Sequence, residues 1–297
     1  MFTTIDTHVA GEAFRVVVHS SIMLNEKDIK ANHEVLQQKY LYEKELLLNE
    51  PRGHRGMSGC IVIPSKVADY GLLFLDHSSV YPFKYAGLLT SLTALLETGN
   101  LAKKENDKYS IETIHGIYNI KANLENQEVT TVYFESRECN VATKELEYSV
   151  VQVDDARNYL IYTLPVVIPE ISLEHLSAIT KWGKEVTGRL AKENSLFDGV
   201  IMVDSTGPTA NNVRSVTFER DGSILRSPGV DSTFAILTMS KQHHELTNHS
   251  VFGSVLIAKR IPETNNRFSI ETQGFTTGMH QFIYDQTDPL KTGFLLK

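Results

Sequence analysis

The sequence is poor in cysteine and tryptophan, with two cysteines (Cys60 and Cys139) and one tryptophan among its 297 residues. So few cysteines exclude a disulfide framework as the basis of the fold. The sequence also lacks any apolar run near the roughly 20 residues that span a bilayer, and its first residues lack a basic segment followed by an apolar one. The net charge of -7 argues against nucleic acid or an anionic membrane as a partner. We therefore expect a soluble, cytoplasmic globular protein without a signal peptide.

Two segments have the pattern of buried central helices. Residues 85–98 (YAGLLTSLTALLET) are apolar on every helical face and end at Gly99, a typical C-cap residue. Residues 233–242 (TFAILTMSKQ) are again mostly apolar. A helix that is hydrophobic all round must be buried. Segments rich in β-branched residues predict strands around both helices, at 13–20, 58–64, 111–120, 199–203 and 213–219.

One central helix wrapped by strands in each half predicts an α/β fold with two similar domains. We expect the first domain to comprise residues 1–150, joined by the C-terminal segment 276–297, and the second to comprise 151–275. Two further segments, 25–49 and 172–193, carry apolar residues at helical spacing and predict amphipathic surface helices.

A series of short motifs runs along nearly the whole chain. They are IDTHVAGEAFR (5–15), PRGHRGM (51–57), ETG (97–99), RDG (220–222), LRSPGVDST (225–233), GFTTGMHQF (274–282) and DPLKTGF (288–294). In composition and order they resemble the motifs of the proline racemase family, which includes hydroxyproline epimerases and trans-3-hydroxyproline dehydratases. The resemblance implies the fold of diaminopimelate epimerase: two pseudo-symmetric α/β domains, each a sheet wrapped around a central buried helix.

In that family the substrate binds in a cleft between the N-termini of the two central helices. The N-terminus of a buried helix offers unpaired amides and a partial positive charge, which suit an amino-acid carboxylate. A cysteine at each helix N-terminus has a lowered pKa. One thiolate removes the α-proton while the opposite thiol supplies one, so no cofactor is needed. The dehydratases replace the second cysteine.

This sequence departs from the family at the positions that carry the chemistry. The second cysteine motif usually reads Asp-Arg-Ser-Pro-Cys-Gly-Thr-Gly-Thr. Here Leu225 takes the place of the amine-binding aspartate, Gly229 that of the cysteine, and residues 230–232 (VDS) that of the Gly-Thr-Gly. Counting back from residues 97–99, the first cysteine falls on Lys84 and the motif histidine on Ala86. Two-thiol racemisation is therefore not available to this chain.

Lys84 and Asp231 are the candidates for rebuilt acid–base chemistry. Lys84 should lie at a helix N-terminus, where the helix dipole and burial both disfavour the ammonium form, so we expect a lowered pKa suited to a general base. Asp231 should lie at the opposite helix N-terminus, which stabilises a carboxylate. The pair could divide proton transfer between base and acid. It could equally form a salt bridge in an inactive site, and structural ion pairs are the commoner case.

The ligand expected is a small carboxylic acid whose amine is less basic than that of proline, or absent, because Leu225 offers no counter-charge. The amides around Gly87, Ser232 and Thr233 would hold its carboxylate, with Tyr85, Leu225 and Gly229 also lining the site. Asp231 would repel a carboxylate in the usual position, which counts against simple retention of the family's ligand.

Other motifs are weaker. His243, His244 and His249 suggest a metal only at first sight, because on a helix His249 would share a face with neither neighbour, and we expect a solvated helix end instead. Cys60 and Cys139 are expected in a strand and a loop, as small buried residues. The stretch 204–208 (DSTGP) predicts a turn. No phosphate-binding loop, dinucleotide fingerprint or nucleophile elbow is present, so we expect no metal and no cofactor.

Two classes of function stay open. In the first, the chain is a cofactor-independent epimerase, isomerase or dehydratase of a small amino or hydroxy acid, with Lys84 as base. In the second, it is a catalytically silent relative that binds a small ligand or a protein partner. Buried Phe83, Tyr85 and Leu225 filling the site would favour the second class. The resemblance also implies a homodimer, although no interface can be read from the sequence.

Overall fold

The computed structural model describes residues 1–297 except 78–81, 155–156, 194, 207–208, 210 and 297. The described chain forms two compact units. Unit 1 comprises residues 1–9, 13–132 and 273–297, and unit 2 comprises residues 10–12 and 133–272. The chain passes from unit 1 to unit 2 within strand β7 (Glu128–Glu135).

Unit 1 is built from a mixed sheet and three helices. The helices are α1 (Ile29–Lys39), α2 (Leu41–Leu48) and α3 (Tyr85–Glu97). The strands are β1 (Phe2–Val9), β2 (Glu12–His19), β3 (Met57–Ile63), β4 (Tyr70–Leu75), β5 (Lys108–Thr113), β6 (Gly116–Glu125), β7 and β16 (Gly274–Phe282). Their order in the sheet is β16-β1-β2-β3-β4-β5-β6-β7.

Unit 2 has a matching set of elements. Its helices are α4 (Leu176–Lys192), preceded by one 3-10 turn (Leu173–His175), and α5 (Val230–Met239). Its strands are β8 (Cys139–Lys144), β9 (Tyr148–Val153), β10 (Arg157–Thr163), β11 (Gly199–Asp204), β12 (Asn212–Phe218), β13 (Glu245–His249), β14 (Val255–Arg260) and β15 (Phe268–Thr272). The sheet order is β15-β14-β13-β12-β11-β10-β9-β8.

The two units repeat one topology. In unit 1, β2 pairs parallel with β3, β3 antiparallel with β4, β4 parallel with β5, and β5 antiparallel with β6. In unit 2, the run β10-β11-β12-β13-β14 has the same alternation of parallel and antiparallel pairs. Each parallel pair is joined through helices: α1 and α2 match α4, and α3 matches α5. The expected pair of pseudo-symmetric α/β domains is therefore confirmed.

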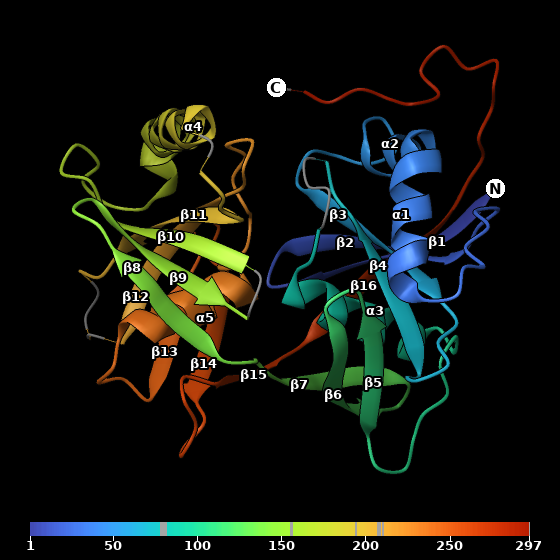
Figure 1. Cartoon of the computed structure of the whole chain (residues 1–297), viewed down its shortest axis with the longest axis horizontal. Coiled ribbons are helices and arrows are strands. Elements are labelled where there is room, and N and C mark those ends of the chain that lie inside the picture. The colour runs from blue at the N-terminus through green and yellow to red at the C-terminus, as the bar shows by residue number, and fades with distance from the viewer. Residues whose placement is uncertain (78–81, 155–156, 194, 207–208, 210, 297) are drawn as a thin grey trace. The chain divides into compact units, whose positions relative to one another are not determined.

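The central helices are α3 and α5, each enclosed by the sheet of its own unit (Figure 1). Helix α3 contacts β1, β3, β6 and β16, whereas α5 contacts β8, β9, β10, β13 and β14. Every residue of α3 from Tyr85 to Leu96 is buried, and so is every residue of α5 from Val230 to Thr238. Their hydroxyl groups bond to carbonyls one turn back, as Thr90 does to Ala86 and Thr238 to Phe234, which allows a polar side chain inside an apolar core.

Helix α4 covers the outer face of unit 2. Its buried residues are Ile179, Gly183, Val186, Thr187 and Leu190, which recur at helical spacing along one face. A side chain at Gly183 would meet the ring of Phe218 at 2.1 Å, so this glycine sets how closely the helix approaches the sheet. The prediction of an amphipathic surface helix over 172–193 is confirmed.

The segment 25–49 forms two helices rather than one. Asp28 caps α1 by accepting a hydrogen bond from the Ala31 amide, and the chain breaks at Tyr40 before α2 begins. Helix α2 is followed by the loop of residues 49–56, which forms hydrogen bonds with the C-terminal segment. Arg52 donates hydrogen bonds to the carbonyls of Leu290 and Lys291, and Glu50 forms a β-bridge with Phe294.

Two smaller expectations are wrong. The second central helix ends at Met239, so His243 and His244 lie in a turn and His249 lies in β13, not at a helix end. Cys139 begins strand β8 instead of lying in a loop, and Cys60 lies in β3 as expected. The predicted turn at 204–208 falls partly outside the described residues.

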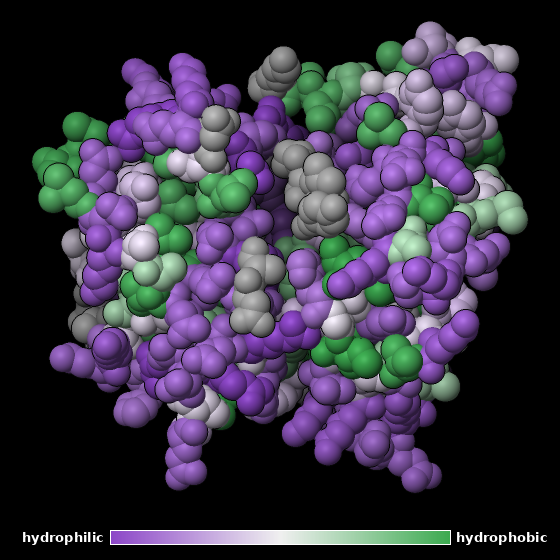
Figure 2. Space-filling model, in the orientation of Figure 1, coloured by the Kyte–Doolittle hydropathy of each residue, from purple (hydrophilic) through white to green (hydrophobic). Residues whose placement is uncertain are grey.

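The surface facing the viewer in Figure 2 is mostly hydrophilic, with apolar side chains gathered in small separate groups. None of the helices in the described part of the chain is both long and apolar enough to cross a bilayer.

Candidate functional site

The N-terminus of α3 carries Lys84. This residue is the N-cap, has extended backbone (φ -143°, ψ 137°) and makes no side-chain cap of the usual kind. Its Nζ donates a hydrogen bond of 3.3 Å to Oγ of Ser58 in β3. The first turn of α3 contains no acidic residue. The amino group of Lys84 and the positive end of the helix dipole therefore lie together, an arrangement that suits an anion.

The residues on either side of Lys84 are packed into the core of unit 1. Phe83 and Tyr85 are both buried, and their rings meet edge to face with centroids 5.7 Å apart. Phe83 also stacks on Tyr118 at 5.3 Å and meets Phe74 at 5.1 Å. This cluster fixes the backbone on both sides of Lys84, whose own side chain is half-buried. Tyr85 thus has a packing role, and its contact with a ligand stays a prediction.

Gly87, in the first turn of α3, allows two aromatic rings to approach the helix. A Cβ at this position would meet the ring of Phe74 at 2.3 Å and that of Phe14 at 2.8 Å. The amide of Gly87 donates to the Lys84 carbonyl at 3.1 Å. The glycine is therefore required by packing.

The N-terminus of α5 has different chemistry. Gly229 is the N-cap and has φ +74°, a left-handed conformation that residues with a side chain rarely adopt. A Cβ at Gly229 would meet Cδ2 of Leu225 and Oγ of Ser232, each at 3.0 Å. Leu225 is half-buried. The position that holds a cysteine in the family's motif therefore has a backbone and a neighbour that both disfavour one.

Asp231 lies in the first turn of α5 and is buried. Its carboxylate accepts a hydrogen bond from the guanidinium of Arg157 at the start of β10. Arg157 in turn forms an ion pair of 2.9 Å with Asp154, and all three side chains are at most 6% exposed. The N-terminus of α5 is thus occupied by a carboxylate of the chain itself, which lies inside a buried cluster of two anions and one cation.

Ser232 and Thr233 are also bound within unit 2. Oγ of Ser232 accepts a hydrogen bond of 2.7 Å from Thr217. Thr233 donates its hydroxyl to the Gly229 carbonyl at 2.7 Å and accepts from Nδ2 of Asn248 at 3.0 Å. The Thr233 amide bonds to the Gly229 carbonyl within the helix. These contacts give both residues a structural role, whether or not a ligand also approaches them.

Cys60 lies in β3 and Cys139 at the start of β8, so neither is on a central helix. Both are free thiols and fully buried in the cores of their units. Burial raises the pKa of Cys60, and burial likewise raises the pKa of Cys139. Neither thiol has the lowered pKa of a proton-transfer group.

The sequence pointed to Lys84 and Asp231 but not to their partners: Ser58 binds Lys84, and Arg157 binds Asp231 and also Asp154. Ser58 was part of a predicted strand, and its position beside PRGHRGM was a usable signal. Arg157 begins an apolar strand without any motif, and Asp154 precedes it in a turn. Among the described residues, no group of three or more His, Cys, Asp or Glu side chains converges as metal ligands would.

Comparison with known proteins agrees with the topology. The chain is similar to a trans-3-hydroxy-L-proline dehydratase of Bacillus thuringiensis subsp. konkukian, with 29% identity over 100% of this chain and 98% of the relative. A probable proline racemase from Agrobacterium radiobacter, solved with bound carbonate, has a TM-score of 0.84 at 19% identity and covers 100% of this chain and 97% of its own. A hydroxyproline epimerase from Agrobacterium vitis, solved with trans-4-hydroxy-L-proline, has a TM-score of 0.83 at 20% identity. The match covers 99% of this chain and 94% of the epimerase.

The sequence profile of the proline racemase family matches residues 4–295, which is nearly the full length of the protein. The chain therefore belongs to the proline racemase family.

Proposed function

We propose that this protein binds a small amino or hydroxy carboxylic acid at the N-terminus of α3, and that any proton transfer uses Lys84 as a single base. The contrast between the two central helices carries this proposal. Helix α3 begins at a lysine and has no acidic residue in its first turn, whereas α5 begins at a glycine and has Asp231 bound to Arg157. An incoming carboxylate is therefore favoured at α3 and disfavoured at α5.

The buried cluster in unit 2 argues for one base instead of two. The carboxylate of Asp231 is bound by Arg157, so it is not free to act as the acid opposite Lys84. With glycine at position 229, no other side chain at the start of α5 replaces the family's second thiol. A single base can exchange an α-proton with solvent, or it can remove the α-proton and then deliver it to the β-hydroxyl, which leaves as water as the double bond forms. The second route is the one named for the relatives at 29% identity, which are dehydratases.

In the proton-transfer step, the neutral amine of Lys84 would take the α-proton of the bound acid and become an ammonium. The negative charge that develops on the substrate carboxylate would then lie against the positive end of α3 and the new ammonium. Ser58 accepts a hydrogen bond from Nζ and so orients the amine. Aromatic packing around Phe83 and Tyr85 holds the backbone on which this depends.

The test is proton NMR in D2O with L-proline, trans-4-hydroxy-L-proline, trans-3-hydroxy-L-proline and a panel of small amino and hydroxy acids. Calorimetric binding titrations of the same compounds run alongside. Lys84→Ala is compared with Lys66→Ala, which removes an exposed lysine of the same unit. We expect binding, and any loss of the α-proton signal, to disappear in Lys84→Ala and to remain in Lys66→Ala. Signal loss that persists in Lys84→Ala would refute Lys84 as the base.

A catalytically silent relative is the second candidate, and the α5 site favours it. The left-handed backbone at Gly229 and the internal Asp231–Arg157 pair both remove features that the family's chemistry uses. Binding without α-proton exchange for every compound would support this candidate, because ligand recognition at Lys84 does not require turnover. Absence of both binding and exchange would refute the carboxylate site itself.

A further inference from the structure

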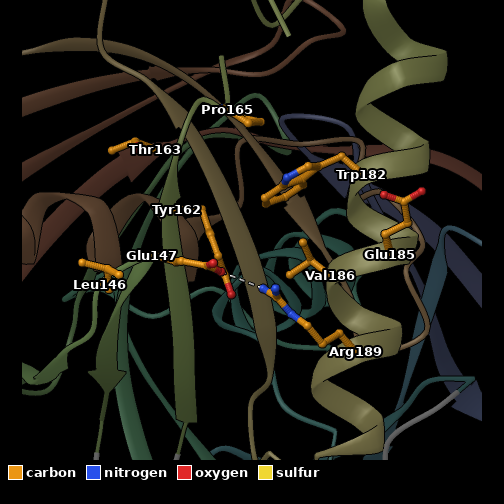
Figure 3. Close-up of a pocket in the computed structure, with 9 residues that line it drawn as sticks. All are labelled: Leu146, Glu147, Tyr162, Thr163, Pro165, Trp182, Glu185, Val186 and Arg189. Carbon is orange, nitrogen blue, oxygen red and sulfur yellow. Dashed lines mark hydrogen bonds and ion pairs between the residues drawn. The ribbon is translucent and has the colours of Figure 1, made fainter. Parts of the chain in front are cut away.

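A pocket of about 550 Å³ lies wholly within unit 2, between α4 and the end of β10 (Figure 3). Its volume falls within the range of about 300–1,000 Å³ that small-molecule sites occupy. Its lining residues come from α4, from β10 and from the turn before β9. None of these elements carries Lys84 or the start of α5, so the pocket goes beyond the function proposed above.

One side of the pocket is aromatic. Trp182 on α4 meets Tyr162 of β10 edge to face, with ring centroids 5.3 Å apart, and packs against Phe218 at 5.6 Å. These contacts fix the indole in place. Leu146 stands at the mouth of the pocket and is fully exposed. An apolar group entering the pocket would therefore meet a rigid aromatic surface and cover a side chain that is otherwise left in water.

The hydroxyl of Tyr162 is a second, independent feature. The residue is 5% exposed, and its buried hydroxyl has no hydrogen-bond acceptor in the described part of the chain. Burial raises the pKa of Tyr162, and nearby Arg189 partly opposes that effect. Figure 3 shows the hydroxyl end of Tyr162 directed toward Arg189. Buried polar groups in proteins are nearly always hydrogen-bonded, so this donor lacks an acceptor that a ligand could supply.

Charged groups of both signs surround that hydroxyl. Arg189 on α4 forms an ion pair of 2.9 Å with Glu147 from the β8–β9 turn, and both side chains are about half exposed (48% and 59%). Such an exposed pair is weak and can be opened or bridged. Arg189 donates to Glu147 and interacts with the Tyr162 hydroxyl, and a guanidinium has five donors, so donors remain for a ligand. Glu185, one turn away on α4, adds a second carboxylate at the edge.

We propose that this pocket binds a free amino acid with an apolar side chain. Its carboxylate would accept hydrogen bonds from Arg189 and from the Tyr162 hydroxyl, which becomes reachable as the ligand separates Arg189 from Glu147. Its ammonium would bind the carboxylates of Glu147 and Glu185, and its side chain would lie on Trp182. Because the pocket has two carboxylates and one guanidinium, it repels a ligand that carries only a negative charge. A zwitterion has a positive group for the carboxylates and a negative group for the guanidinium.

Trp182 is the single tryptophan of the chain, so its fluorescence reports on this pocket alone. The probes are L-leucine, L-isoleucine and L-phenylalanine, titrated against the full-length protein with excitation beyond the absorption of tyrosine and phenylalanine. We expect a saturable change in emission. N-acetyl-L-leucine, which lacks the ammonium, and L-leucinamide, which lacks the carboxylate, should each bind at least tenfold more weakly. Saturation-transfer NMR on the same samples detects binding elsewhere.

The variants separate the contacts. Tyr162→Phe removes the hydroxyl and keeps the ring, and should weaken binding about three- to tenfold. Arg189→Met should weaken it about ten- to a hundredfold, because a charged hydrogen bond is lost. Lys192→Met, an equal charge change at an exposed position of α4, should leave the affinity measured from the Trp182 emission unchanged. If Arg189→Met does not fold, the two leucine analogues test the same contacts on the unaltered chain.

Three outcomes would overturn the proposal. The first is an emission that no probe changes up to its solubility limit. The second is binding seen by NMR with the emission of Trp182 unaltered, which would place the ligand elsewhere. The third is binding that is equally strong for leucine and leucinamide or that survives in both Tyr162→Phe and Arg189→Met. The proposed function is tested separately, by the comparison of Lys84→Ala with Lys66→Ala, so the failure of either proposal can be told from the failure of the other.

Discussion

Arg157 binds the carboxylates of Asp231 and Asp154 at once, and it does so inside unit 2, with all three side chains buried. Asp231 belongs to the helix end where the family's motif carries its second cysteine, and Arg157 starts a strand 74 residues earlier in the sequence. A buried charge persists only when it is paired. The glycine that replaces the motif's cysteine and the buried ion pair of Asp231 thus lie at the same helix N-terminus, that of α5.

Replacement of Arg157 should cost far more stability than replacement of either partner. Arg157→Met leaves two buried carboxylates without this cation, and we expect a loss of about 3–5 kcal/mol in the free energy of unfolding. Asp231→Asn keeps the Arg157–Asp154 pair and should cost less. Urea unfolding followed by circular dichroism measures both. An Arg157→Met variant no less stable than Asp231→Asn would show that the cluster is not held by this cation.

Restoring the cysteines should not restore racemisation. At Gly229 the left-handed backbone alone should cost a side chain about 1–3 kcal/mol, and the contact with Leu225 adds to it. We expect Gly229→Cys to lower stability and the double variant with Lys84→Cys to leave the optical rotation of L-proline unchanged. Gly188→Ala, an open helical position of α4, is the matched control and should be neutral or slightly stabilising. Racemisation by the double variant would contradict our account of the α5 terminus.

Both native thiols should resist modification. Burial raises the pKa of Cys60 and of Cys139, so neither forms an appreciable thiolate at pH 8, and neither is accessible. With a colorimetric disulfide reagent, the folded protein should release no thiol signal over minutes, whereas protein unfolded in guanidinium chloride should release two equivalents. Rapid release of one equivalent of thiol signal by the folded protein would reveal a reactive cysteine and would contradict this prediction.

A surface pair in unit 1 gives a pH-dependent prediction. Burial alone would raise the pKa of Asp69, but hydrogen bonds from Lys104 and Ser110, and the charge of Lys104, outweigh it and lower the pKa. A carboxyl with a lowered pKa in the folded state adds stability above its unfolded pKa, and this is lost as pH falls through the folded value. Asp69→Asn should therefore cost up to about 1 kcal/mol at pH 7, because the pair is partly exposed, and progressively less below about pH 4.

The measurement is urea unfolding of the wild-type and variant proteins from pH 7 to pH 2.5. Glu105→Gln removes an exposed carboxyl next to Lys104 in the sequence and serves as the control for general charge effects. A stability difference that stays constant across this range would contradict a role for the ionised carboxyl.

The central helices could be predicted because their signal is local. Thirteen residues without a polar face can only be buried, and the motif at 97–99 fixed the distance back to Lys84. The break at Tyr40 was not predictable, because neither glycine nor proline marks it. The partners of Asp231 could not be predicted either, since Arg157 joins it through folding and not through spacing. The left-handed conformation of Gly229 was not predicted, although glycine permits it.

The pairing of the first strand with the last has a consequence for synthesis on the ribosome. Strand β1 pairs with β16 along its whole length, and the segment beyond β16 is tied to the loop at Arg52. Unit 2 is contiguous from residue 133 to 272 apart from three early residues, so its sheet is complete once that stretch has emerged. Unit 1 begins to be synthesised first, but its sheet is complete only after β16 has been synthesised. The later-synthesised half is thus the first that can fold, against the usual N-terminal-first order.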